Sequence, residues 1–272
     1  MANASSAEPI RLRVFISYSR KDDEFAQDLL AGLDAAGFEP NLDKHDIAAG
    51  EDWEARLGRL IETADAVVFV ISPDAVTSQR CAWEVERSIA LKKRLLPIVW
   101  RSVAETLVPT HLKQLNYIFF DRPLSFGSSL LALSKALKMD IGWIREHTRI
   151  GEAALRWDGR GRVDALLPRG EELLAAKEWL KAQPKYAPGP TMLTQEFINF
   201  GEDAEAARST VERQRLDQMA AALEREKSAQ ADREKALRQA QAALRTTQRA
   251  QTAVGALLVA VIIPASVGPI WR

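Results

Sequence analysis

Five short runs rich in apolar residues recur along the first half of the chain, separated by stretches of helix length. Runs of this kind are typical of parallel strands that are buried on both faces of a sheet. Parallel strands need long crossover connections, and the intervening stretches are long enough to be helical crossovers. The pattern predicts an α/β domain with an open, doubly wound parallel sheet of five strands, over residues 14–17, 38–42, 66–71, 95–99 and 117–120.

The stretches between the runs have the spacing of amphipathic helices. Phe25 and Leu29 lie on one face of a helix that we expect over residues 22–36. A second helix is expected over residues 51–64, and a third begins near Ser78, a residue type that caps helix N-termini. Ligands of such sheets bind beyond the carboxyl ends of the strands, so functional residues are expected in the loops that follow the runs.

Beyond residue 140 the alternation of apolar runs stops, and helical stretches follow one another. Residues 141–183 predict a helical extension, and the prolines in residues 184–190 predict a linker after it. Before the first run, residues 1–9 form a polar leader without the apolar core of a cleaved signal peptide. The α/β domain is therefore expected over residues 10–140 and in the cytoplasm.

Residues 191–251 contain no proline, and they predict one long helix. Gln230 interrupts a ladder of leucines at seven-residue spacing, and the neighbouring seam contains Lys227 and Glu234. This is the pattern of a weak coiled coil, with a single solvated helix as the alternative. The leucines of the ladder are Leu216, Leu223, Leu237 and Leu244.

Residues 252–271 carry no charged side chain, and Arg272 follows them directly. The length of this uncharged stretch suits a membrane-spanning helix. Arg245 and Arg249 precede this stretch, which would place its N-terminal side in the cytoplasm. The stretch therefore predicts a single-pass membrane protein anchored by its C-terminal helix. The alternatives are an apolar tail that packs in an oligomer and an incomplete segment of a longer chain.

Composition excludes several classes of function. Lys and Arg together number 37, as do Asp and Glu, so the chain lacks the basic excess of a nucleic-acid-binding protein. No GxGxxG follows a run and no GxxxxGKS/T occurs, which argues against a dinucleotide-binding Rossmann domain and a P-loop NTPase. Cys81 is the only cysteine, and the three histidines lack metal-ligand spacing, so we expect no disulfide, metal site or cofactor.

Three segments, in order and at separations that fit the five runs, resemble the TIR (Toll/interleukin-1 receptor) domain family. They are VFISYSRKD at residues 14–22, the stretch from Leu42 to Trp53 that resembles the family's BB loop, and ISP followed by CAWE within residues 71–98. The resemblance covers roughly residues 10–140 and implies a flavodoxin-like fold. The later helices resemble bacterial TIR proteins that carry a stalk, a membrane helix and then a WD-repeat propeller.

The resemblance implies one of two functions, because TIR domains are either adaptors that assemble with other TIR domains or enzymes that cleave NAD+. The enzymes use one glutamate on the third helix, which corresponds to Glu84 in Cys81-Ala82-Trp83-Glu84. One carboxylate can suffice because nicotinamide leaves NAD+ as a neutral molecule and needs no acid, unlike the sugar oxygen of ordinary glycosides. A fixed anion can stabilise the oxocarbenium-like ribose that remains.

The same resemblance implies a substrate site around Glu84. Arg20 suits a pyrophosphate, which a guanidinium binds with two hydrogen bonds, although it is equally a surface arginine. Trp53 and Asp43 have structural alternatives, as a core residue and a strand-end cap. Many catalytic members have a tryptophan where this chain has Arg80. The implied substrate-binding residues are Ser17, Tyr18, Arg20, Asp43, Asp46, Gly50 and Trp53.

The sequence therefore supports a membrane-tethered TIR effector of signalling or antiviral defence that takes NAD+ as substrate. It would release nicotinamide and ADP-ribose, or a cyclic form, when its domains cluster. Its partners would be other TIR domains, in a homo-oligomer, and the membrane. The alternatives are a non-catalytic TIR adaptor and a membrane-anchored oligomerisation stalk with a degenerate TIR head.

Overall fold

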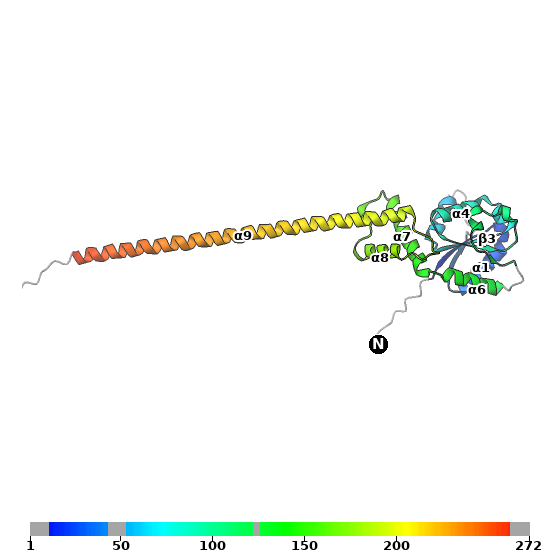
Figure 1. Ribbon diagram of the computed structural model, residues 1–272, viewed down its shortest axis with the longest axis horizontal. Helices are drawn as coiled ribbons and strands as arrows, with labels where there is room; N and C mark the ends of the chain where they lie inside the picture. The colour runs from blue at the N-terminus through cyan, green and yellow to red at the C-terminus, as the bar shows by residue number, and fades with distance from the viewer. Residues whose placement is uncertain (1–10, 43–52, 122–125, 262–272) are drawn as a thin grey trace, which may run out of the picture. The chain divides into compact units, whose positions relative to one another are not determined.

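The computed structural model describes residues 11–42, 53–121 and 126–261, with only the helical backbone given for residues 253–261 (Figure 1). The chain forms two compact units, one ending at Glu205 and the other beginning at Ala206. The first unit contains a parallel five-stranded sheet in the order β2-β1-β3-β4-β5, which confirms the predicted open parallel sheet. The strands are β1 (Arg13–Ser17), β2 (Glu39–Leu42), β3 (Ala66–Ile71), β4 (Arg94–Val99) and β5 (Ile118–Phe119).

Helices connect the strands and continue beyond the last one. In the described residues the longer helices of the α/β part are α1 (Asp23–Ala35), α2 (Trp53–Thr63), α4 (Gln79–Ala90) and α6 (Phe126–Lys138). Short turns of helix lie between them: η1 (Arg20–Asp22), α3 (Pro73–Val76), η2 (Glu105–Leu107) and α5 (Thr110–Lys113). The C-terminal region adds α7 (Ile141–Gly159), η3 (Asp164–Leu166), α8 (Gly170–Lys181) and α9 (Met192–Val261).

The pleat of the strands divides the hydrophobic core between the two faces of the sheet. Successive side chains of a strand point to opposite faces, so Val14 and Ile16 pack with α1 and α6, whereas Phe15 packs with α2. Figure 1 shows α4 on one side of the sheet and α1 and α6 on the other. The edge strand β2 has exposed and half-buried positions, which explains the mixed composition of the second run.

The helices after the sheet extend the same core. Trp143 and Trp157 of α7 are buried in the cluster that contains the α1 face of the sheet, together with Trp179 of α8 and Phe197 of α9. Trp143 stacks on Trp179 with ring centroids 4.3 Å apart. The backbone of the proline-rich segment is held as well, because the Trp143 indole donates to the carbonyl of Pro188 at 2.9 Å. The extension and the α/β part therefore share one hydrophobic core.

Helix α9 is continuous over 70 residues. Its described side chains from Arg213 to Thr252 are exposed, including the leucine ladder. The prediction of a single-pass membrane protein with a span over residues 252–271 is wrong: no helix among the described residues is long and apolar enough to cross a membrane. The apolar part of α9 starts only at Ala253 and the described helix ends at Val261, well short of the roughly 20 residues that a span needs. Residues 262–271 lie outside the described part.

Two basic side chains are buried where α7 meets the amino edge of the sheet. Lys93 donates from Nζ to the carbonyl oxygens of Glu62 and Ala64 at 2.7 and 2.8 Å. Burial lowers the pKa of Lys93 to about 8. The imidazole of His147 lies 3.1 Å from the carbonyl oxygen of Gly189 through Nε2, and burial, followed by the charge of Lys93, lowers its pKa to about 4. His147 is therefore a neutral structural residue near pH 7, with the proton on Nε2.

We predict that His147→Gln makes stability less sensitive to acid. The unfolded chain binds a proton at this histidine near pH 6.5, whereas the folded protein resists protonation down to about pH 4. The free energy of unfolding of the wild type should therefore fall by up to about 3 kcal/mol between pH 6.5 and 4 on account of this group. Denaturant unfolding across that pH range measures the effect.

The exposed His111 supplies the matched control, because His111→Gln should leave the acid sensitivity as it is in the wild type. Parallel pH profiles for the wild type and His147→Gln would contradict the assignment of His147 as a neutral buried group.

Candidate functional site

The carboxyl end of β1 places Ser17 against α4. Ser17 lies two residues after Phe15, so the pleat directs both side chains to the face of the sheet that α2 and α4 cover. The Ser17 hydroxyl donates a hydrogen bond to the carboxylate of Glu84, and the two residues are 0% and 3% exposed. Glu86, two positions further along α4, is exposed. The structure thus separates Glu84, a buried carboxylate at the strand ends, from an ordinary surface glutamate.

The first turn of α4 is attached to the loop that follows β1. Ser78 caps the helix by accepting from the backbone N–H of Cys81 at 3.3 Å, as the sequence predicts. The thiol of Cys81 donates in turn to the backbone carbonyl of Tyr18 at 3.3 Å. Burial, and next the nearby charge of Glu84, raises the pKa of Cys81 to about 11. Cys81 is therefore a protonated thiol that packs, and it is unsuited to act as a nucleophile.

The other residues implied by the resemblance have different surroundings. Tyr18 is buried, and its hydroxyl donates to a carboxylate oxygen of Asp23 at 3.0 Å. Arg20 is exposed at the start of η1. Ser17 and Glu84 are thus brought into contact, whereas Tyr18 packs toward α1 and Arg20 lies at the surface. Asp43, Asp46 and Gly50 lie outside the described residues.

An aromatic cluster joins the start of α2 to α4. The rings of Trp53 and Trp83 meet edge to face with centroids 5.5 Å apart, and both residues are half-buried. The guanidinium of Arg80 lies over the Trp53 ring, 5.1 Å from its centroid. Such a cation–π contact is most favourable with tryptophan. Arg80 therefore stacks on an aromatic residue supplied by α2.

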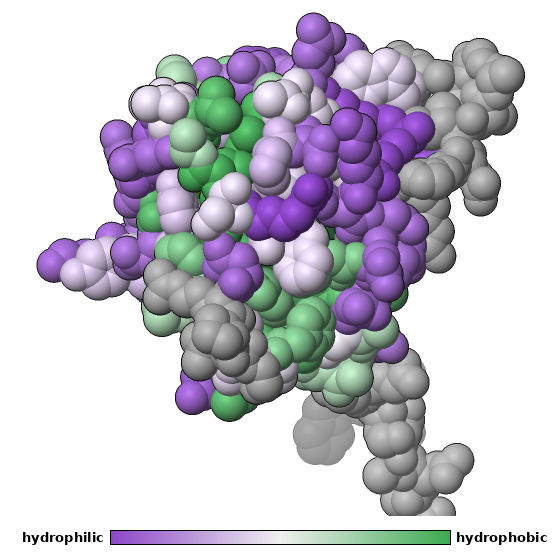
Figure 2. Space-filling model, turned by 90° about the vertical axis from the view of Figure 1, so that its right-hand side faces the viewer, coloured by the Kyte–Doolittle hydropathy of each residue, from purple (hydrophilic) through white to green (hydrophobic). Residues whose placement is uncertain are grey.

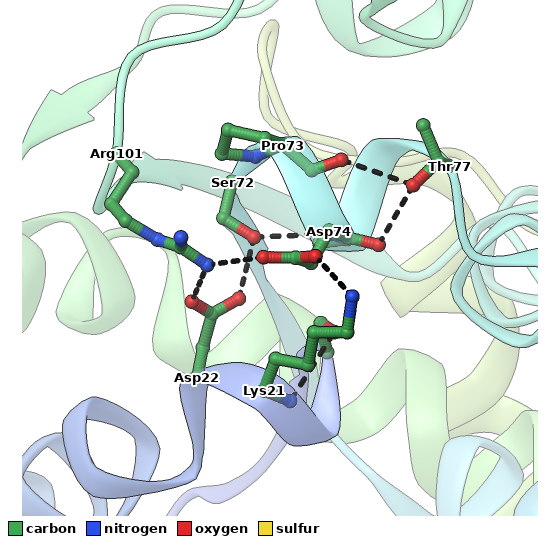
Figure 3. A network of polar contacts seen from close by, with 9 residues as sticks. Lys21, Asp22, Ser72, Pro73, Asp74, Thr77 and Arg101 are labelled. Carbon is green, nitrogen blue, oxygen red and sulfur yellow. Dashed lines mark hydrogen bonds and ion pairs between the residues drawn. The ribbon is translucent and has the colours of Figure 1, made fainter.

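A polar network, which we call the edge latch, links three loops at the carboxyl edge of the sheet (Figure 3). Its centre is the Asp22 carboxylate, which accepts from the Ser72 hydroxyl and from the guanidinium of Arg101. Arg101 also donates to Asp74 at 2.7 Å, and Lys21 reaches the other oxygen of Asp74 at 2.8 Å. The hydrogen bonds from Lys21 and then Arg101 hold the pKa of Asp74 below its usual value.

Sequence reasoning missed the edge latch. Asp22 belongs to the segment that resembles the family, but Arg101 is 79 residues away in the chain. The one local signal was the Ser72-Pro73 pair, in which Ser72 accepts from the N–H of Ala75 at 3.0 Å and caps α3. A local pattern can indicate a cap, but it cannot show that the same hydroxyl also donates to Asp22.

Several cavities lie away from the carboxyl edge of the sheet. One of about 200 Å³ lies at the amino edge of the sheet, lined by Lys93 and His147 among others. No group of His, Cys, Asp and Glu side chains within the described ranges could hold a metal ion. Figure 2 views the side that lies to the right in Figure 1, and hydrophobic residues show there among polar ones.

Comparison with known proteins identifies this part of the chain. Residues 14–130 match the family model described as TIR domain. Together with the parallel five-stranded sheet, this match makes the α/β part of the first unit a TIR domain, followed by a helical C-terminal region.

Solved structures with distant similarity include other TIR domains and a glycosidase. The TIR domain of the Toll-related receptor TRR-2 from Hydra magnipapillata is 24% identical over 45% of this chain and 97% of its own, with a TM-score of 0.38. The TIR domains of the Roq1 resistosome are 14% identical over 46% and 99%, with a TM-score of 0.40. The CMP N-glycosidase BcmB of Clostridium botulinum is 15% identical over 47% and 99%, with a TM-score of 0.32.

We predict that the native Cys81 thiol is nearly inert toward thiol reagents. A pKa of about 11 in place of the ordinary 9.0 reduces the thiolate fraction at pH 8 about 100-fold, and burial slows access further. Because Cys81 is the only cysteine, the absorbance released by an aromatic disulfide reagent reports on it alone. The unfolded chain in denaturant is the control and should react at least 100-fold faster. Equal rates in the two states would show that α4 does not pack against the loop after β1 as described.

Proposed function

We propose that this chain is a TIR-domain effector that cleaves NAD+ to nicotinamide and either ADP-ribose or a cyclic form of it, when several TIR domains cluster. The observation that carries the proposal is the buried carboxylate of Glu84, held by Ser17 at the carboxyl edge of a parallel sheet. Ligands of doubly wound sheets bind at this edge.

Cleavage of the bond between ribose and nicotinamide requires one fixed negative charge and few other groups. The bond between ribose and nicotinamide breaks with both electrons going to the ring nitrogen, so nicotinamide leaves as a neutral molecule. The ribose is left electron-deficient, and a preorganised carboxylate stabilises the positive charge that develops in the transition state. When ADP-ribose is the product, water then adds to the ribose carbon and releases its proton to the solvent, which completes hydrolysis. Ser17 supports this role by fixing the orientation of the Glu84 carboxylate.

The remaining site residues are assigned as part of the same proposal. Arg20 is exposed and can pair with the pyrophosphate, for which a guanidinium is well suited. The half-buried Trp53 and Trp83 offer an aromatic surface for a base, with Arg80 stacked beside them. Tyr18, Asp43, Asp46 and Gly50 complete the assignment that the family resemblance implies.

The burial of Glu84 also bears on regulation. A side chain that is 3% exposed in a single chain cannot meet a ribose unless the surrounding loops move. Assembly of TIR domains would supply the contacts that shift the loops to an open arrangement, since a conformational equilibrium moves only through differential binding. The isolated chain would then be silent and the clustered chain active. We assign the clustering to contacts between TIR domains and to the leucine ladder of α9.

A second candidate function is a non-catalytic TIR adaptor. The burial of Glu84 favours the adaptor function, because a carboxylate that is enclosed and hydrogen-bonded can serve to position α4 against β1. The two functions differ in what they require of Glu84. An adaptor needs the hydrogen bond from Ser17, whereas an enzyme also needs the charge.

We predict that Glu84→Gln abolishes release of nicotinamide from NAD+ while the protein remains folded. The amide keeps the shape and can still accept from Ser17, but it lacks the charge that stabilises the ribose cation. Glu86→Gln on the exposed side of the same helix is the matched control and should keep full activity. Chromatography of the products, with the circular dichroism spectrum as a check on folding, measures both. Full turnover in Glu84→Gln would show that Glu84 is not the catalytic carboxylate, and absence of nicotinamide from concentrated wild type would favour the adaptor.

We further predict that specific activity rises with protein concentration and that the leucine ladder causes part of the rise. The four leucines are 53 to 61% exposed along α9, so a second helix with the same seven-residue period can cover them. Replacing all four with serine should flatten the concentration dependence without changing the fold of the first unit. The variant carries Leu216→Ser, Leu223→Ser, Leu237→Ser and Leu244→Ser.

The matched control changes four positions with the same spacing, each two residues further along α9 and so on a different side of the helix. These changes are Gln218→Ser, Arg225→Ser, Gln239→Ser and Thr246→Ser. Specific activity that stays constant from dilute to concentrated wild-type protein would show that the ladder is a passive part of the helix.

A further inference from the structure

The edge latch and the proposed catalytic carboxylate of Glu84 both lie at the carboxyl edge of the sheet. Its members come from three loops, after β1, β3 and β4, which all end at the carboxyl edge of the sheet. Asp22 is the shared partner, with a side chain that is 1% exposed. A buried carboxylate is costly unless donors satisfy it, so its donors must remain in place whenever the domain is folded.

The position of α4 depends on the loop that the latch holds. From Ser72 the chain runs through α3 directly to Ser78, the cap of α4. The Ser72 hydroxyl donates to Asp22 while it accepts from the backbone N–H of Ala75, so one side chain both begins α3 and fixes it to the loop after β1. A shift of Ser72 would therefore move the start of α4, and Glu84 with it.

The loop after β1 is held at both ends. At its start, Ser17 donates to Glu84, and the Tyr18 carbonyl accepts from the Cys81 thiol. At its end, Asp22 accepts from Ser72 and from Arg101. Arg101 also binds Asp74 within α3, as Figure 3 shows, so one guanidinium joins the loop after β4 to both of the others.

We infer that Asp22 and Arg101 are positioning residues, which hold the loop after β1 and the start of α4 fixed to each other, so that the Glu84 carboxylate keeps its place at the sheet edge when other loops open to admit the ribose. Neither residue is catalytic, and the inference rests on the proposed function for its effect on turnover. Small displacements of a reacting group can reduce the rate about 100-fold. Arg101 is the better residue to test, because its side chain is 43% exposed and its replacement opens no core cavity.

The test compares Arg101→Ala and Arg101→Lys with the wild type in two measurements. In NAD+ cleavage, Arg101→Ala should lower kcat at least 10-fold with KM changed less than 3-fold, because the substrate-contacting residues remain. Arg101→Lys keeps the charge and a single donor nitrogen in place of the planar guanidinium, so it should recover part of the loss. A purely structural role would instead lower the fraction of folded protein and leave kcat per folded molecule unchanged.

The second measurement does not depend on catalysis. Loosening the loop should expose the Cys81 thiol, so Arg101→Ala should react with a thiol reagent at least 10-fold faster than the wild type under native conditions. Arg87→Ala is the control, because Arg87 lies on α4 but pairs with Glu62, away from the latch. It should leave thiol reactivity unchanged.

The two readouts separate the inference from the function on which it rests. If the wild type releases no nicotinamide, the proposed function fails. Thiol reactivity alone then tests whether Arg101 holds the loop after β1 against α4. Faster reaction of Cys81 in Arg101→Ala than in Arg87→Ala supports the latch. Unchanged thiol reactivity in Arg101→Ala, or unchanged kcat in an active enzyme, overturns it.

Discussion

The carboxylate of Glu84 is buried at the end of a parallel sheet, and this single constraint organises the region around it. Removing a carboxylate from water costs several kcal/mol unless hydrogen bonds replace those it loses. The hydroxyl of Ser17 supplies one such bond from the last residue of β1. Because strand and helix both have fixed geometry, the bond sets how α4 lies against the sheet. The buried thiol of Cys81 and its raised pKa are consequences of the same packing.

A second buried carboxylate, Asp22, repeats the arrangement a few residues further along the loop. Its donors include a hydroxyl and a guanidinium, so it gathers segments that follow three different strands. Hydrogen bonds to an ionised buried group are stronger than those between neutral groups. The carboxyl edge of this sheet is therefore built around two enclosed negative charges, one that holds loops together and one that is proposed to act on substrate.

The two parts of the helical region have different roles, one in the stability of the TIR domain and one in assembly. Helix α7 and the helices next to it share the hydrophobic core of the TIR domain, with Trp157 fully buried among them. From Ala206 onward, α9 belongs to a separate unit whose described side chains are mostly exposed. A helix that buries no face gains little from tertiary packing, so its stability comes from helix propensity and from any partner that covers the leucines. The first region stabilises the domain, and the second is available for assembly.

The sequence by itself determined the parallel sheet, the cap of α4 at Ser78 and the identity of Glu84 as the carboxylate to examine. These features are local, because burial of a strand, capping and a short motif each depend on residues close together in the chain. Only the tertiary structure decided that Ser17 binds Glu84 and that Arg101 binds Asp22, pairs separated by 67 and 79 residues. Such pairs form where strand order and register bring loop ends to the same edge. The apolar composition of residues 252–271 predicted a membrane span, whereas no helix among the described residues is long and apolar enough to cross a membrane.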